Sequence, residues 1–230
     1  MINSRISKKK PIPIKKERTL RAQTTTRSMG RRERRAEHTR VKLFRCALRL
    51  IARRGISNVT VEEITEAADV GKGTFFNYFQ SKEHVLGVMA EIQLGKIREA
   101  AALAQRKDAS LEAVLRRMVL RLTEEPGRNP RMARALLSSF LASRDVRAEV
   151  LKHMKEGRRI IAGLVAMGQK RGEIDRAMKT ELVAVQLFQS FMGTVLLWSI
   201  EERSALRTRA AKTFEQFWKS VAAPAKGKKR

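Results

Sequence analysis

The chain has 230 residues, a hydrophobic fraction of 43% and a formal net charge of +27, with 50 Lys and Arg against 23 Asp and Glu. It is long enough to bury one large core or two small ones, and its charge predicts a polyanionic partner, nucleic acid first and an anionic membrane surface second. The plainer interpretation of that charge is a solvated, self-repelling surface. A single cysteine excludes an intrachain disulfide and favours the cytoplasm.

Residues 1–36 form a strongly basic segment. Pro11 and Pro13 disfavour a helix there, and so charged a segment cannot bury enough apolar surface to fold by itself. Such an arm can lie along phosphates or enter a minor groove, whereas the plainer interpretation is a disordered, solubilising tail. Its end could also extend the helix that follows. It has no apolar run before a cleavage site, so we do not expect a signal peptide.

A first helix is predicted from Glu37 to Arg54, where Arg53, Arg54 and Gly55 form a typical C-terminal signal. Its apolar positions at helical spacing are Val41, Phe44, Leu48 and Ile51. Cys46 falls inside this helix, and we expect a buried structural thiol there rather than a redox sensor.

Residues 59–83 are predicted to form two short helices joined by a tight turn. Thr60 is a good N-cap, and Glu63 three residues later completes a capping box. Asp69-Val70-Gly71 interrupts this helix after about two turns, which is typical of a helix-turn-helix. The second helix is predicted to run from about Lys72 to Phe79.

The second helix has two chemically different faces. Phe75 and Phe79 are four residues apart and should point into the core, so Gly73 and Asn77 lie on the opposite, exposed face. An amide can pair with adenine and a hydroxyl can touch a base, so Asn77 and Thr74 are the predicted base readers. The predicted phosphate contacts are Thr60, Lys72, Tyr78 and Lys82. Gly71 and Gly73 would let the helix start approach a phosphate closely, and Phe76 completes the predicted DNA-binding set.

This stretch resembles the DNA-binding domain of the TetR (tetracycline-repressor) family of bacterial transcription regulators. The positions that match the family pattern in register are Thr60, Ile64, Ala68, Val70, Gly71, Gly73, Thr74, Phe75, Phe76, Tyr78, Phe79, Ser81 and Lys82. Asp69 stands where the family usually has Gly, and Phe76 where Tyr is commoner. The resemblance runs from Val41 to about Leu86. It implies an all-α homodimer that binds a palindromic DNA operator, mainly as a repressor.

The rest of the chain is predicted to be helical, because no alternating Val/Ile/Thr-rich run bounded by turns occurs. The predicted helices open at Ser81, Ser110 and Asn129-Pro130 and then span about Asp145–Arg171, Leu182–Ile200 and Ser204–Val221. We therefore divide the chain into the basic arm (1–36), a three-helix helix-turn-helix domain (37–83), a larger helical ligand-binding and dimerisation domain (84–222) and a basic tail (223–230).

Residues 182–200 carry no charge, so a membrane span has to be considered. Gln186, Gln189, Ser190 and Thr194 inside the run, with a glutamate at each end, favour instead a helix buried in a dimer. The resemblance implies that the last two helices pair with those of a second chain. The predicted interface residues are Leu187, Phe191, Val195, Trp198, Phe214, Phe217 and Trp218.

A pocket for an unidentified small-molecule inducer is implied by the resemblance, between the helices of the larger domain. Met and Phe side chains suit a large adaptable site, although each could equally be ordinary core. The candidates are Met118, Leu122, Met132, Phe140, Met154, Met167, Phe188, Phe191 and Met192, with Trp198 as a further one.

No catalytic, metal-binding or cofactor-binding set is predicted. The three His are far apart, no Cys/His cluster has metal-ligand spacing, and adjacent glutamates on a helix do not face each other. Gly71-Lys72-Gly73-Thr74 resembles part of a P-loop but lacks the first Gly and a preceding strand. The alternatives that stay open are a weakly specific DNA-coating protein driven by the basic tails and a membrane-associated protein. We expect a cytoplasmic regulator without a membrane partner.

Overall fold

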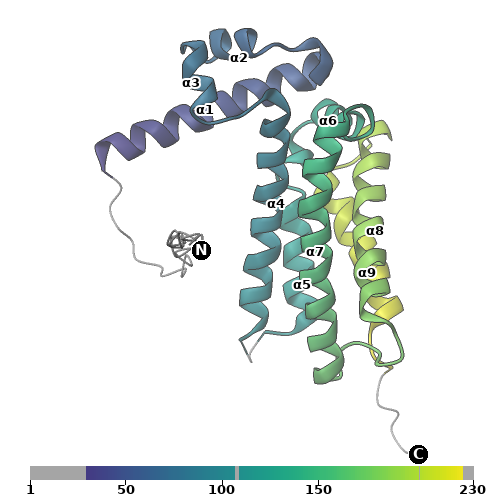
Figure 1. The fold of residues 1–230 in the computed structure, drawn as a ribbon. Coiled ribbons are helices and arrows are strands. Elements are labelled where there is room, and N and C mark those ends of the chain that lie inside the picture. The colour runs from purple at the N-terminus through teal and green to yellow at the C-terminus, as the bar shows by residue number, and fades with distance from the viewer. Residues whose placement is uncertain (1–29, 107–108, 202, 225–230) are drawn as a thin grey trace, which may run out of the picture.

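The computed structural model describes residues 30–106, 109–201 and 203–224, and within them the chain is helical apart from turns and one isolated bridge between Ile174 and Ala222 (Figure 1). The predicted all-α fold is confirmed. The elements are α1 (Arg31–Arg54), the 3-10 turn η1 (Ile56–Asn58), α2 (Val61–Ala67), α3 (Lys72–Phe76), α4 (Lys82–Ala104), α5 (Leu111–Leu122), the 3-10 turn η2 (Pro126–Arg128), α6 (Pro130–Ala142), α7 (Arg144–Arg171), α8 (Thr180–Glu201) and α9 (Leu206–Val221).

Two parts are distinguished by helix direction. Helices α1, α2 and α3 form the head, which lies across one end of a bundle made by α4 to α9, the body (Figure 1). Helix α4 begins in the head and runs down the body, packed along α7. Helix α4 therefore connects the head to the body.

The helix boundaries are largely those that the capping signals predict. Ser81, Ser110 and Asn129 are the N-caps of α4, α5 and α6, and the side chain of each accepts a hydrogen bond from a backbone N–H of the first turn. Gly172 ends α7 in the left-handed conformation, with φ of 74°.

Two boundaries differ from the prediction. Helix α1 begins at Arg31, six residues before Glu37, because Glu33 caps it by accepting a hydrogen bond from the N–H of Gly30 at 2.9 Å. The last residues of the predicted arm therefore belong to the helix, whereas residues 1–29 lie outside the described part of the chain. Helix α3 ends at Phe76 rather than Phe79, since the backbone tightens into a turn at Asn77 and Tyr78.

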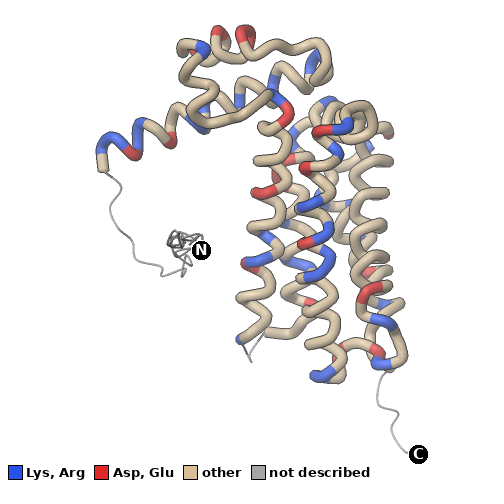
Figure 2. Tube along the Cα trace, viewed as in Figure 1, with Lys and Arg blue, Asp and Glu red and all other residues tan. Residues whose placement is uncertain are grey.

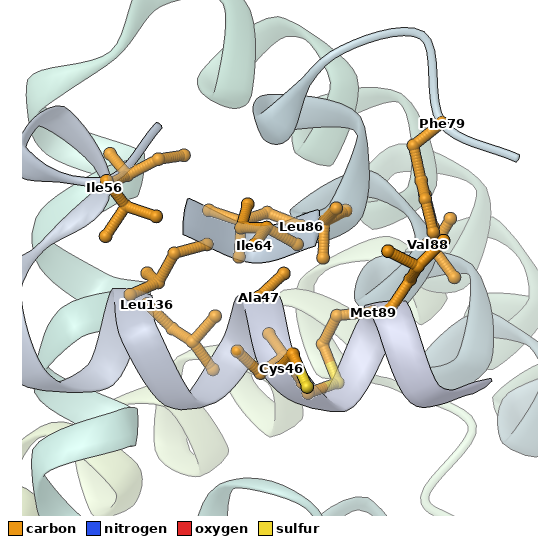
Figure 3. Packing of buried hydrophobic residues seen from close by; sticks show 14 of the residues in the cluster. Cys46, Ala47, Ile56, Ile64, Phe79, Leu86, Val88, Met89 and Leu136 are labelled. Carbon is orange, nitrogen blue, oxygen red and sulfur yellow. The ribbon is translucent and has the colours of Figure 1, made fainter. Parts of the chain in front are cut away.

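The core of the head does not stop at the predicted domain boundary. Leu43, Cys46 and Ile51 of α1 pack with residues of α2, α3 and the first turns of α4 in one buried cluster. The same cluster includes Leu136 of α6 (Figure 3) and Val150 of α7. The head and the body therefore share a hydrophobic core at their junction, and Cys46 is buried there as predicted.

A second cluster fills the body between α4, α5, α7, α8 and α9. The only strongly buried cation among the described residues is Lys96 of α4, which is 6% exposed. Its Nζ donates to the carbonyl oxygen of Arg121, to Glu124 Oε2 at 3.0 Å and to Glu125 Oε2 at 2.5 Å. This network ties the middle of α4 to the end of α5.

Candidate DNA-binding face and ligand cavity

The start of α2 is held by a capping box of the predicted kind. Thr60 Oγ1 accepts a hydrogen bond from the N–H of Glu63 at 3.2 Å, and Glu63 Oε2 accepts one from the N–H of Thr60 at 2.8 Å. Glu63 Oε2 also lies 2.6 Å from Arg54 Nη2 at the end of α1. The Arg54 guanidinium and the Thr60 N–H lower the pKa of Glu63 from 4.5 to about 2. One carboxylate thus joins the end of α1 to the start of α2.

The turn between α2 and α3 contains Asp69, which has φ of 51° and is the only non-glycine residue with positive φ among those described. Only glycine adopts this left-handed conformation without steric cost. The conformation explains why Gly is usual here in the family that the sequence resembles. It also shows that this chain makes the turn with an Asp.

Helix α3 places its two faces as the sequence predicts. Phe75 and Phe79 are 0% and 1% exposed, and their ring centroids lie 5.3 Å apart. Gly73 and Asn77 are exposed on the other side, and Phe76 is 49% exposed beside them. An added Cβ at Gly73 would meet no atom within 4 Å. Nothing in the described part of the chain therefore explains a glycine at this position.

The remaining predicted contact residues have mixed surroundings. Thr60, Gly71 and Lys72 are exposed, whereas Thr74 and Tyr78 are half-buried, and Tyr78 packs against the head core. Lys72 Nζ forms an ion pair with Glu62 Oε1, and both side chains are more than half exposed. That pairing, chiefly a hydrogen bond from Lys72, lowers the pKa of Glu62.

Lys82 is occupied inside the head. Its Nζ donates to the carbonyl oxygens of Ile56 and Val59, each at 2.9 Å, and the side chain is half-buried. These two bonds tie the first turn of α4 to η1, the turn between α1 and α2. The sequence pointed to a phosphate contact and missed this anchoring role, because only the fold brings Lys82 to carbonyl groups more than twenty residues away.

Basic side chains line the first turns of α1. Arg31, Arg32, Arg34 and Arg35 are all exposed, and this end of the helix projects away from the body (Figure 2). The positive charge of the described head is therefore spread from the start of α1 to Lys72.

A cavity of about 150 Å³ lies in the body between α4, α5, α6, α7 and α8. Seven of the predicted pocket residues line it: Met118, Leu122, Phe140, Met154, Phe188, Phe191 and Met192. The other two lie outside the lining of this cavity. Met132 packs against the head core, and Met167 packs against the second cluster. Both lie on helix faces turned away from the cavity, which composition alone does not reveal. Trp198 is also outside the lining and is buried in a small cluster with Leu206.

Three polar residues in the cavity wall were not anticipated: Gln93 of α4, and His153 and Arg158 of α7. Gln93 stands four residues after Met89 and four before Ile97, so the three residues share one face of α4. This spacing was the signal in the sequence that could have placed Gln93 in the cavity wall. The Arg158 guanidinium carbon lies 5.6 Å from the centre of the Phe188 ring.

Most of the predicted dimer-interface residues lie in the core of a single chain. Those buried within the chain are Leu187, Val195, Trp198, Phe214 and Phe217, each at most 5% exposed. Phe191 is half-buried in the cavity wall, and Trp218 stacks on Phe214. The exposed apolar residues of α8 are instead Leu182, Leu196, Leu197 and Ile200. Because α8 is apolar all round, its sequence did not reveal which side enters the core.

Helix α8 is long and apolar enough to cross a membrane by length and composition, and 33% of that window is buried inside the chain. Within the described residues it packs against α6, α7 and α9, as a core helix does. In the same part of the chain, no group of three or more His, Cys, Asp or Glu side chains could hold a metal ion.

Comparison with known proteins places these features in context. The family model described as bacterial regulatory proteins, tetR family, matches residues 43–89, from α1 into the first part of α4. The chain is 28% identical over 158 residues to the transcriptional repressor DhaR of Mycobacterium sp. (strain GP1), covering 64% of this chain and 76% of that protein. It is 44% identical over 62 residues to the transcriptional regulator TcmR of Streptomyces glaucescens, covering 27% of each.

A solved structure of similar fold is the transcriptional regulator FadR from Bacillus subtilis in complex with stearoyl-CoA. It superposes with a TM-score of 0.64 and covers 77% of this chain and 96% of that one, at 19% identity. At this identity the likeness concerns the fold alone. It extends through the body, well beyond the residues that the family model matches.

Proposed function

Because the chain belongs to the TetR family of bacterial regulatory proteins, we propose that it is a cytoplasmic, dimeric repressor that a small molecule releases from its operator. The relative DhaR carries the name of a repressor. No catalytic step enters the proposal, and neither a cofactor nor a membrane is among its partners. The operator and the inducer are to be found by experiment.

The observation that carries the proposal is the division of α3 into a buried and an exposed face. Phe75 and Phe79 fix the helix from behind, which leaves Gly73 and Asn77 facing outward. The open space at Gly73 has no explanation within the chain, and a closely approaching DNA backbone would supply one. Asn77 and Thr74 are the proposed base readers, with Gly71, Lys72, Phe76, Tyr78 and Thr60 around them.

Lys82 is proposed to support the DNA-binding face rather than to contact phosphate. Its two bonds to η1 position the first turn of α4 against the segment that leads into α2. We assign it to holding the DNA-binding face in shape, so that phosphate contact falls mainly to Lys72 and to the basic start of α1.

The dimer is proposed to form through the exposed side of α8. Leu196, Leu197 and Ile200 share one helical face and are 45%, 54% and 64% exposed. Apolar residues gathered in this way on a surface mark interaction sites. A second copy of α8, packed against this face by a two-fold axis, would cover them and set the spacing of the two heads.

Induction is proposed to act where the cavity meets the head. Met89, Leu136 and Val150 line the cavity and also belong to the core cluster under α1, α2 and α3. A ligand in the cavity would therefore press on side chains that support the head. It would shift the population toward dimers whose heads are wrongly spaced for DNA.

Deleting residues 1–29 tests whether the head or the basic arm provides specificity. The cut leaves Gly30 in place, whose N–H takes part in the cap of α1. Genome-wide footprinting with and without cell extract first supplies an operator. The shortened chain should bind this operator more weakly than the parent, yet keep its preference over a scrambled duplex. If most binding and the preference vanish together, the chain is a DNA-coating protein driven by its arm.

A further inference from the structure

The cavity wall contains one buried acceptor that nothing satisfies. Gln93 Oε1 is the only buried side-chain polar atom of the described residues that has no hydrogen-bond partner. Gln93 belongs to the cavity lining, and its neighbours on the same stripe of α4, Met89 and Ile97, are apolar lining residues too. A buried acceptor left without a donor costs about 1–3 kcal/mol, so its presence calls for an explanation.

The orientation of the Gln93 amide is fixed by its other end. Its Nε2 donates to the carbonyl oxygen of Leu122 at 3.4 Å and to Glu125 Oε2 at 3.2 Å. If the amide oxygen and nitrogen were exchanged, the oxygen would face the Leu122 carbonyl oxygen and the Glu125 carboxylate, and none of these three atoms can donate a hydrogen bond. Glu125 itself is held by the buried Lys96 Nζ at 2.5 Å. The amide nitrogen is thus committed to the protein, and the oxygen is the end of the amide left without a partner.

We propose, as an extension of the ligand-controlled function above, that the inducer is a small neutral molecule with an apolar body and one hydroxyl group that donates to Gln93 Oε1. The apolar body follows from the lining by Met, Phe, Leu and Ile side chains. A dry cavity of about 150 Å³ lined by such residues accepts a molecule as large as benzene. A phenol with a short alkyl group therefore fits both the size and the chemistry.

The charged groups around the cavity argue against an ionised ligand at this position. A carboxylate placed against Gln93 Oε1 would meet an acceptor, with the Glu125 carboxylate behind the amide. An ammonium group elsewhere in the cavity would meet the Arg158 guanidinium near Phe188. Arg158 is the one group that could anchor an anion instead, and this rival is an outcome of the test.

The test is calorimetric titration of the full chain with four compounds of equal framework. They are 4-ethylphenol, 4-ethyltoluene without a polar group, 4-ethylanisole with an acceptor only, and 4-ethylbenzoate with a negative charge. One hydrogen bond to an otherwise unpaired acceptor predicts that 4-ethylphenol binds about five- to tenfold more tightly than 4-ethyltoluene and 4-ethylanisole. Equal affinities, no binding of any compound, or tightest binding of 4-ethylbenzoate would each overturn the proposal.

A matched pair of variants assigns the preference to Gln93. Gln93→Met keeps an unbranched side chain of similar length without the acceptor. The affinity of 4-ethylphenol relative to that of 4-ethyltoluene should therefore fall to about one, while 4-ethyltoluene still binds. Gln189→Met, at an exposed position of α8 outside the cavity lining, should keep the preference of the parent. If Gln93→Met keeps the full preference, Gln93 is not the partner. If Gln93→Met does not fold, as judged by circular dichroism, the affinities of the four compounds for the parent chain still show whether the cavity prefers a hydroxyl donor.

Operator binding without any ligand separates this inference from the function on which it rests. If the parent binds its operator but shows no preference for the hydroxyl compound, only the ligand assignment is wrong. If it recognises no operator, the regulator assignment itself is wrong.

Discussion

At the scale of single residues, charge on the head is arranged by short-range pairs. Lys72 and Glu62 are paired across α2 and α3, and both are exposed. A carboxylate beside a proposed phosphate contact repels DNA while it holds the lysine in place. The two side chains should therefore affect DNA binding in opposite directions.

Lys72→Gln should weaken binding to operator and scrambled duplex alike and reduce the slope of log affinity against log salt by about 1. Glu62→Gln should strengthen binding to both, because the repelling charge is gone. Fluorescence anisotropy over a range of salt concentrations measures both effects. Lys82→Gln is the contrasting variant, since it should lower the stability of the head by freeing two carbonyl groups. An unchanged salt slope in Lys72→Gln would remove Lys72 from the contact surface.

Glu63 makes the stability of the head depend on pH. Its pKa is lowered from 4.5 to about 2, chiefly by Arg54 and then by the N–H of Thr60. A lowered folded-state pKa stabilises the protein above the unfolded-state value, and that contribution is lost as the pH falls from 4.5 to about 2. In Glu63→Gln the decline in unfolding free energy over this range should be shallower, as measured by urea titrations. Arg54→Gln should act in the same direction. Identical slopes in all three chains would show that this carboxylate is not held as described.

At the scale of elements, sequence signals located most helix ends because capping is local chemistry. Helix starts are predicted by N-cap side chains that accept a hydrogen bond from a backbone N–H within the next three residues. These N-caps are Thr60, Ser81, Ser110 and Asn129. The early start of α1 was harder to predict, because charge composition favours disorder and the cap at Gly30 lacks a side chain. The buried and exposed faces of residues 72–79 followed from spacing alone, since Phe75 of α3 and Phe79 just after it are four residues apart.

Helix α8 shows where sequence reasoning fails. In an amphipathic helix the spacing of the apolar residues shows which side is buried. In a helix that is apolar all round, this spacing does not distinguish one side from another. Packing against α7 and α9 decides that Leu187 and Val195 face inward, which leaves Leu197 and Ile200 outside. Most of the predicted pocket residues line the cavity because five helices, α4 to α8, converge on it, so most large Met and Phe side chains of the body lie in its wall.

The exposed face of α8 predicts the effect of a single charge. Leu197→Glu should convert the dimer to a monomer of 26.2 kDa, because a carboxylate would be buried at the interface without a partner. Multi-angle light scattering at micromolar concentration measures the mass. The matched control is Leu141→Glu, a change at an 80% exposed leucine of α6 that should leave the dimer intact. A Leu197→Glu chain that stays dimeric would place the interface elsewhere.

At the scale of the whole molecule, one continuous set of apolar contacts runs from the cavity to the DNA-binding face. Met89 belongs to the cavity wall and to the head core, one turn beyond Val85 of α4, which is buried in the same core. Lys82 then fastens the start of α4 to η1. The long helix α4 is thus attached at one end to the head and, in its middle, to the ligand site and the Lys96 network. A ligand needs to favour one of two positions of this helix to change the spacing of the heads.

Two such chains joined through α8 would present two copies of α3 to one side of a DNA duplex. In a symmetric dimer of this kind the recognition helices enter successive major grooves, about 34 Å apart. The operator should therefore contain two inverted half-sites, and specificity should depend on the outward side chains of α3 more than on the basic arm.

Selection of binding sites from a random duplex library, with the parent and with Asn77→Ala, tests this most directly. The parent should enrich an inverted repeat, and Asn77→Ala should lose preference at one symmetric pair of base positions at a cost of about 1–3 kcal/mol, with the other positions unchanged. Enrichment of the same sequence to the same degree by both chains would show that the outward face of α3 does not read DNA.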